Sequence, residues 1–217
     1  MSSTEKDTLT PLFDGAIVAE LPANFADVSK LRQVPDNQEV FIDKDGYTSI
    51  IVEICERFGS AGSSAEIDGE ALTVHLEDLV GDDADSVKVW NTTETEFSQL
   101  PAGTPAYTLI ATQTPHRGHA AGTPDFTAII LTLVRLESEA TDILITVNVP
   151  HIKGEYDEDD VDIAMGKQGQ LIGDAVEYAA NIWSTFEIKN WKLFNGPGRR
   201  GDLELREGWA EAGKKRD

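Results

Sequence analysis

Alternating apolar and polar positions divide the chain into short strands. Such alternation, bounded by turn residues, predicts strands over residues 15–21, 38–42, 72–76, 86–90 and 107–112. Two more predicted strands, at 126–136 and 142–149, are apolar on both faces, and we expect them to form a hairpin around 138–140. In the first of them one face carries Ile129, Leu131 and Leu133, and the other carries Ile130, Val134 and Leu136. A strand that is apolar on both faces must be covered twice, which predicts layers on both sides of a central hairpin.

Two segments have the apolar spacing of a helix instead. Residues 48–58 place apolar side chains at Ile50, Ile51, Ile54, Cys55 and Phe58, which predicts a helix capped by Thr48 or Ser49. Glu53 and Glu56 then lie together on the opposite face of this helix, because residues three apart are neighbours there. Residues 170–186 predict a second, longer amphipathic helix.

The order of these elements indicates one α+β domain. A single antiparallel β-sheet of about six strands, with α-helices packed on both faces, fits the sequence of strand, strand, helix, several strands and helix. Residues 1–10 are polar and predicted to be a disordered lead, residues 11–194 form the domain, and residues 195–217 form a polar tail. The Gly-, Ser- and Pro-rich segments 59–70 and 114–125 are predicted loops.

Charge narrows the class of partner. The 217 residues include 39 acids and 18 bases, for a formal net charge of −21. Such a field repels nucleic acid and anionic membranes and favours a basic protein partner. The longest apolar run, at 128–134, is too short for a membrane helix. Cys55 is the single cysteine, which fits a reducing compartment, so we expect the protein in the nucleus and cytoplasm. Nothing in the sequence demands a dimer, so we also expect a monomer.

Motifs for chemistry are weak throughout the chain. No Gly-x-x-x-x-Gly-Lys-Ser/Thr loop for phosphate occurs, and the pair His116 and His119 has no further metal ligands nearby in the sequence. The segment from Asp43 to Gly46 begins like a calcium loop, but Ile54 stands where a bidentate Glu is required. We therefore predict no catalytic residue, no metal site and no cofactor.

One connecting segment carries more functional groups than a connector needs. It reads Asp27-Val-Ser-Lys-Leu-Arg-Gln-Val-Pro-Asp-Asn-Gln-Glu-Val-Phe41. This segment resembles the signature of the Ran guanine nucleotide release factor family, the Mog-type nuclear-import proteins. Residues 12–17, 49–56, 75–79 and 141–145 resemble further parts of that family, so the resemblance runs from about residue 12 to residue 194.

The resemblance implies a fold and a function. The fold is a PsbP-like α/β/α sandwich. The function is binding of the small GTPase Ran and promotion of GTP release in support of nuclear protein import, without catalysis on a small substrate. Carried over to this sequence, the acidic Ran-binding surface involves the signature segment and the first predicted helix, with Asp27, Arg32, Asp36, Glu39, Glu53 and Glu56.

Each of these residues also has a structural interpretation. Asp27 can cap a short turn, Asp36 can shape a bend after Pro35, and Arg32 can pair with a nearby carboxylate to hold the loop. Glu53 and Glu56 fit a solvated helix face equally well. The alternative functions are a small-ligand-binding protein and a general acidic interaction scaffold on the same fold. A deep apolar pocket with convergent polar groups would indicate the first of these.

Overall fold

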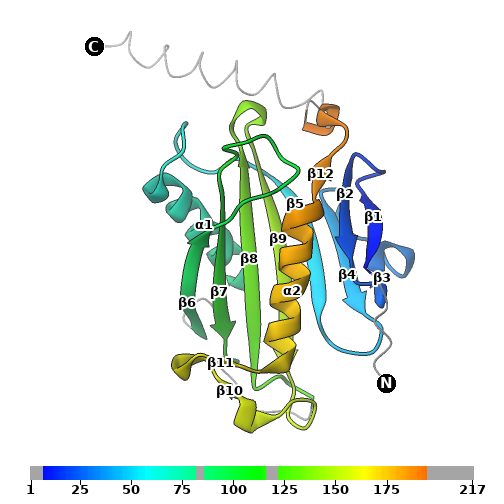
Figure 1. Ribbon diagram of the computed structural model, residues 1–217, viewed down its shortest axis with the longest axis vertical. Coiled ribbons are helices and arrows are strands. Elements are labelled where there is room, and N and C mark those ends of the chain that lie inside the picture. Colours follow the sequence, from blue (N-terminus) through cyan, green and yellow to red (C-terminus); the bar gives the residue numbers. More distant parts are fainter. Residues whose placement is uncertain (1–6, 82–85, 116–121, 195–217) are drawn as a thin grey trace.

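A seven-stranded antiparallel sheet forms the centre of the molecule (Figure 1). The computed structural model describes residues 7–81, 86–115 and 122–194. Strand order in this sheet is β3-β4-β5-β9-β8-β7-β6, and every neighbouring pair is antiparallel. The strands are β3 (Phe25–Asp27), β4 (Gln38–Asp43), β5 (Ser49–Glu56), β6 (Val87–Glu94), β7 (Ala106–Gln113), β8 (Phe126–Leu136) and β9 (Thr141–His151).

Two smaller sheets accompany the main one in the described residues, so the prediction of a single sheet of about six strands is wrong. One sheet has the order β1-β2-β12, from Thr8–Leu12, Ile17–Leu21 and Glu187–Ile188. The other pairs β10 (Val161–Asp162) with β11 (Lys167–Gln168). Residues 8–10, which the sequence placed in a disordered lead, belong to β1, because the whole of β1 pairs in register with β2.

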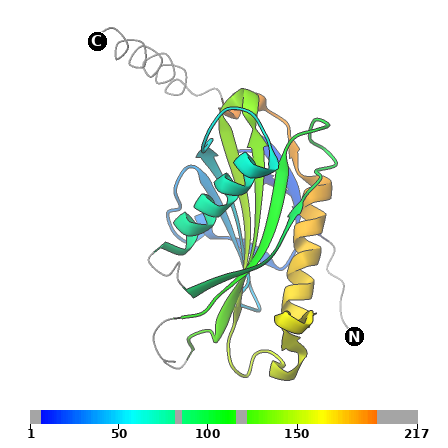
Figure 2. The ribbon, with the colours of Figure 1, turned by 90° about the vertical axis from the view of Figure 1, so that its left-hand side faces the viewer.

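Helices cover opposite faces of the main sheet, as predicted (Figure 2). Helix α1 (Ala65–Val80) packs its Leu72 and Leu76 with Ile129, Leu131 and Leu133 of β8. Helix α2 (Gly169–Thr185) packs on the other side, against the alternate residues of the same strand. That second core cluster includes Ala128, Ile130, Val134, Ile172, Ala175 and Ile182. β8 is therefore apolar on both faces because a helix covers each face of the sheet, as the sequence indicated.

The helix predicted over residues 48–58 is wrong, because residues 49–56 form β5, a strand inside the sheet between β4 and β9. Its burial alternates, with Ile50, Val52 and Ile54 buried and their neighbours half-buried or exposed. In a run where most residues are apolar, the spacing fits a helix and a strand alike. The strand is favoured because Ile and Val are branched at Cβ. Pairing with β4 on one side and β9 on the other stabilises it further.

The first helix lies later in the chain, at α1, where a strand at 72–76 and a loop at 59–70 were predicted. Ser64 caps it, since its hydroxyl accepts a hydrogen bond from the Ile67 N–H at 3.2 Å. Its buried face has helical spacing, but two of its five positions are polar, which hid the period. The five are Asp68, Ala71, Leu72, His75 and Leu76.

The second helix and the central hairpin agree closely with expectation. Helix α2 spans Gly169–Thr185 where residues 170–186 were predicted, and β8 and β9 pair along their whole length. Ala140 closes the turn between them with a left-handed backbone, φ 46°. The short 3-10 helices of the described chain are η1 (Val28–Lys30), η3 (Glu137–Glu139), η4 (Glu158–Asp160), η5 (Ile163–Met165) and η6 (Trp191–Phe194). No helix among the described residues is long and apolar enough to cross a membrane.

Candidate functional site

Asp27 stands at the junction of β3 and η1. Its Oδ1 accepts hydrogen bonds from the Ser29 N–H at 2.8 Å and the Ser29 hydroxyl at 2.6 Å, so it does cap a short turn. Its Oδ2 has Lys30 Nζ at 3.7 Å. Burial raises the pKa of Asp27, but the bonds from Ser29 and the Lys30 ammonium outweigh burial and hold the pKa below its ordinary value. The capping carboxylate therefore stays ionised at neutral pH.

Glu39 of β4 lies beside the β1–β2 turn. Its Oε1 accepts a hydrogen bond from the Phe13 N–H at 2.6 Å. That turn is unusual, because Phe13 and Asp14 both have left-handed backbones, with φ 49° and 55°. Burial raises the pKa of Glu39, and the charges of Asp27 and Asp14 raise it further, against the bond from Phe13. We call Asp14, Asp27 and Glu39 the acidic cluster, since each adds to the same negative field.

Arg32 and Asp36 are exposed in the segment between η1 and β4. Within the described residues Arg32 forms no ion pair with Asp27 or Asp36, so a carboxylate does not hold its guanidinium to the loop. The bend at Pro35 is confirmed, because the Gln38 N–H donates to the Pro35 carbonyl at 2.9 Å. Sequence reasoning missed Leu31, whose side chain is 72% exposed next to these charges.

Glu53 and Glu56 do not share a face, because they belong to a strand and not to a helix. Residues three apart on a strand point to opposite sides of the sheet. Glu53 lies opposite Gln38 and its Oε1 accepts from Asn37 Nδ2 at 3.1 Å, which ties the signature segment to β5. Glu56 is exposed at the end of β5, beyond the start of β4. The structure thus gathers Asp14, Asp27 and Glu39, joins Glu53 to the same segment, and leaves Glu56 at the strand end.

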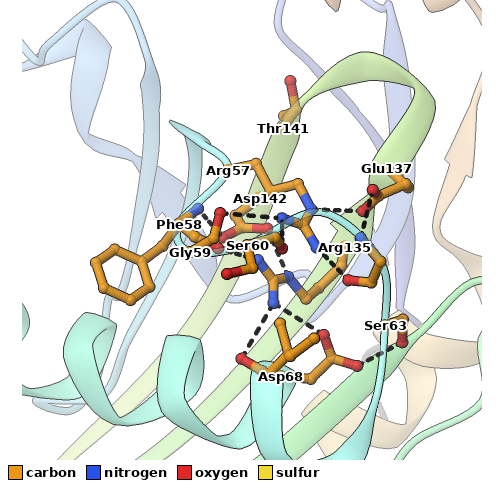
Figure 3. A network of polar contacts seen from close by, with 12 residues as sticks. Arg57, Phe58, Gly59, Ser60, Ser63, Asp68, Arg135, Glu137, Thr141 and Asp142 are labelled. Atoms are coloured by element: carbon orange, nitrogen blue, oxygen red, sulfur yellow. Dashed lines mark hydrogen bonds and ion pairs between the residues drawn. The ribbon is translucent and has the colours of Figure 1, made fainter. Parts of the chain in front are cut away.

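A buried polar network lies just beyond β5, and no pattern in the sequence indicated it (Figure 3). Arg135 of β8 is 1% exposed, and its Nε lies 3.1 Å from Asp142 Oδ1. Its Nη1 donates to Asp68 Oδ1 of α1 at 2.8 Å. His75 Nε2 lies 3.0 Å from the other oxygen of Asp142. Every charged side chain of this buried network therefore has a partner of opposite sign or a hydrogen bond.

The same network holds the connection between β5 and α1. The Phe58 N–H donates to Asp142 Oδ2 at 2.9 Å, and Arg135 Nη2 donates to the Phe58 carbonyl. Arg57 donates to the Ser60 carbonyl at 2.6 Å and places its Nε 2.7 Å from Glu137 Oε2. The chain immediately after Glu56 is therefore held by two arginines, Arg57 within the connection itself and Arg135 on β8.

A cavity of about 240 Å³ opens beside Asp27, between β1, the β2–β3 connection and β4. Its walls include Pro11, Leu21, Pro22, Phe25 and Phe41. No group of three or more His, Cys, Asp or Glu side chains that could hold a metal ion occurs among the described residues. The pair at 116 and 119 lies outside them. Cys55 packs on the α1 side of the core, as a half-buried core thiol.

Comparison with known proteins identifies the family of this chain. The family model described as Ran-interacting Mog1 protein matches residues 10–150. The probable Ran guanine nucleotide release factor of Dictyostelium discoideum is 35% identical over 143 residues, which are 63% of this chain and 70% of that protein. The Ran guanine nucleotide release factor of Homo sapiens is 36% identical over 145 residues, covering 64% of this chain and 74% of that protein.

A solved structure shares the fold. The Ran-binding protein Mog1p of Saccharomyces cerevisiae superimposes with a TM-score of 0.64 over 88% of this chain and 99% of its own, at 24% identity. The matched region of the family model contains most of β1, all of β2 to β8 and nearly all of β9, together with the whole signature segment and the acidic cluster. The chain therefore belongs to the Mog1 family, the Ran-interacting Mog1 proteins.

Proposed function

We propose that this protein binds the small GTPase Ran through the acidic surface around its signature segment and promotes release of guanine nucleotide, above all GTP. The proposal includes a supporting role in nuclear protein import, in the nucleus and cytoplasm, by a monomer that is no enzyme. Relatives named Ran guanine nucleotide release factor and nuclear import protein support it. The observation that carries it is the acidic cluster, built where the signature segment meets the β1–β2 turn.

Electrostatics explains why such a surface binds a basic partner. Three carboxylates close together raise the free energy of the free protein, and a cationic partner relieves that repulsion on binding. The raised pKa of Glu39, caused first by burial and then by Asp27 and Asp14, is the sign of this stored repulsion. The proposed surface comprises Asp27, Arg32, Asp36, Glu39, Glu53 and Glu56, with Asp14 added by the structure.

Release of nucleotide follows if the protein binds nucleotide-free Ran more tightly than nucleotide-bound Ran. Binding free energy that differs between two states of Ran must lower the affinity of the ligand that prefers the other state. A difference of about 3 kcal/mol weakens nucleotide binding by roughly 150-fold. No chemical step on the nucleotide is required, which is consistent with a non-enzymatic regulator. The helices on both faces of the sheet are consistent with the PsbP-like class that forms part of the proposal.

Nucleotide release from Ran tests the proposal directly. Ran loaded with fluorescent GTP or GDP is mixed with an excess of unlabelled nucleotide, with and without this protein. The double variant Asp27→Asn, Glu39→Gln should accelerate release much less than the wild type. Its matched control, Glu155→Gln, Glu158→Gln, removes the same charge from the exposed 153–160 segment and should act like the wild type.

Two results would favour the alternatives. Tight binding to Ran with no change in release indicates a general acidic scaffold. Absence of any binding to Ran rejects the proposal. The cavity beside Asp27 gives the small-ligand alternative little support, because its volume of about 240 Å³ is smaller than the roughly 300–1,000 Å³ of typical ligand pockets.

A further inference from the structure

We infer that the cavity beside Asp27 receives one lysine or arginine side chain of the bound partner. This inference rests on the proposed function and names the contact that anchors it. The cavity combines apolar side chains with Thr8, Thr10, Lys30 and the ionised carboxylate of Asp27, within the acidic surface. A long cationic side chain is the one type that suits both the apolar side chains and the carboxylate.

The walls of the cavity come from four parts of the chain, of which β3 and η1 contribute Phe25, Asp27 and Lys30. Pro11 belongs to β1, Leu21 and Pro22 end β2 and begin the next turn, and Phe41 lies on β4. Asp27 contributes the single acidic side chain of the lining. A volume of about 240 Å³ suits one side chain better than a cofactor or metabolite. The methylene stem of a lysine or arginine can lie along the apolar walls with its charged head at the carboxylate.

The carboxylate of Asp27 is ionised and held in place in the free protein, as binding of a cation requires. Ser29 fixes the carboxylate by two hydrogen bonds to Oδ1, so Oδ2 is held in one place. Next to Oδ2 stands Lys30, at 3.7 Å, but its side chain is 79% exposed. An ion pair so exposed contributes little, because water screens it and the lysine remains free to move. A cation delivered by the partner can therefore displace the Lys30 ammonium at small cost.

Other types of side chain fit poorly. An acidic side chain would be repelled by Asp27 and by Glu39 and Asp14 behind it. A purely apolar side chain would take water away from the Asp27 carboxylate and bring no charge to replace it, which is unfavourable for an ionised group. The inference therefore commits to a cationic side chain, and arginine has the geometric advantage of several donors in one plane.

Three variants separate this contact from the general field of the protein. Asp27→Asn removes the charge at the cavity, and Ala23→Phe fills the cavity while leaving every charge in place. Glu155→Gln is the control, because Glu155 is exposed, carries the same charge, lies outside the proposed Ran-binding surface and does not line the cavity. Affinity for Ran is measured by calorimetry at two salt concentrations. We expect Asp27→Asn and Ala23→Phe each to weaken binding at least tenfold, and Glu155→Gln to weaken it less than threefold.

A set of Ran variants, each with one surface lysine or arginine changed to alanine, then identifies the side chain. One of them should bind wild-type protein at least tenfold more weakly, yet lose nothing further against Asp27→Asn or Ala23→Phe. If Ala23→Phe binds Ran as the wild type does, or if no cation of Ran couples to Asp27, the inference is wrong while the proposed function stands. If the wild type does not bind Ran, both fail. Thr10→Phe, which fills the cavity from β1, replaces Ala23→Phe should that variant not fold.

Discussion

Arg135 and Asp142 face each other across the β8–β9 hairpin, with Nε and Oδ1 3.1 Å apart and both side chains almost fully buried. The two residues occupy directly opposite positions on the neighbouring strands β8 and β9. It also reaches out of the sheet, because Arg135 binds Asp68 on α1 and Asp142 binds the Phe58 N–H after β5. One pair of charges therefore connects the central hairpin, the first helix and the connection between them.

Removal of Arg135 should strongly destabilise the fold. Arg135→Met leaves two buried carboxylates, Asp68 and Asp142, without their cation, and breaking a buried pair typically costs about 3–5 kcal/mol. Urea unfolding followed by tryptophan fluorescence measures the free energy of unfolding. Lys189→Ala is the control, since it breaks the exposed pair with Glu187 and should cost less than about 1 kcal/mol. Equal losses in the two variants would contradict the structural role of the network.

The same network explains why the first helix was missed in the sequence. Its core-facing positions include Asp68 and His75, which a hydrophobicity pattern counts as surface. They are buried because Arg135 and Asp142, some 70 residues later in the chain, pair with them. A pairing over such a distance leaves no local trace in the sequence. Helix α2 has no such partner on its buried face and was found almost to the residue.

The interpretation of β5 failed for a different reason. Most positions between residues 50 and 54 are apolar, namely Ile50, Ile51, Val52 and Ile54. The spacing of apolar residues therefore did not distinguish a helix from a strand. The consequence extends to the site, because the two glutamates expected on one helix face point to opposite sides of a strand. Two members of the acidic cluster, Asp27 and Glu39, were singled out from the sequence, but the contribution of Asp14 depends on the left-handed β1–β2 turn, which composition does not reveal.

Neutralising Glu39 should stabilise the protein while weakening its binding to Ran. The pKa of Glu39 is raised by burial and by nearby carboxylates, so the folded state disfavours the ionised form at neutral pH. Glu39→Gln removes that penalty and keeps an oxygen to accept from the Phe13 N–H. Sites built for binding often carry such a conflict between stability and function.

The sign of this effect should depend on pH. An acid whose folded pKa is raised destabilises the fold above that pKa, and the penalty vanishes as pH falls below the unfolded value. Unfolding by urea should show Glu39→Gln more stable than the wild type at pH 7, with the difference shrinking toward pH 4. Glu155→Gln, at an exposed position, should show no gain at either pH. A variant that is less stable at pH 7 would refute this account of Glu39.

Charge reversal at Glu56 should slow association with Ran more than reversal at a remote site. Glu56 pairs with Thr141 near the β8–β9 turn, whereas Glu158 follows the far end of β9. The 11 residues of β9 place the two ends roughly 35 Å apart, well beyond the screening length in physiological salt. Glu56→Lys and Glu158→Lys change the net charge equally. Stopped-flow association should be severalfold slower and less salt-dependent only for Glu56→Lys, and equal effects would show that overall charge alone steers binding.

His151 should make the protein less stable in mildly acidic solution. Its side chain is fully buried, and its Nδ1–H donates to the Val149 carbonyl at 3.0 Å, while among the described residues Nε2 has no hydrogen-bond partner. Phe126 stacks on the ring with centroids 4.2 Å apart, and Tyr156 packs against its edge. Burial lowers the pKa of His151 below 6.5, although the bond to Val149 and the charge of Asp125 raise it in part. Protonation is therefore opposed in the folded state.

A lowered histidine pKa gives a definite pH dependence. Below about pH 6.5 His151 is protonated in the unfolded chain but stays neutral in the folded protein. The free energy of unfolding therefore falls as pH drops toward the folded pKa. His151→Phe keeps an aromatic ring against Phe126 and cannot take up that proton. Urea unfolding between pH 7.5 and 5.5 should show a clear loss for the wild type and a smaller loss for His151→Phe. Parallel losses in the two proteins would mean that other groups, and not His151, govern stability in this range.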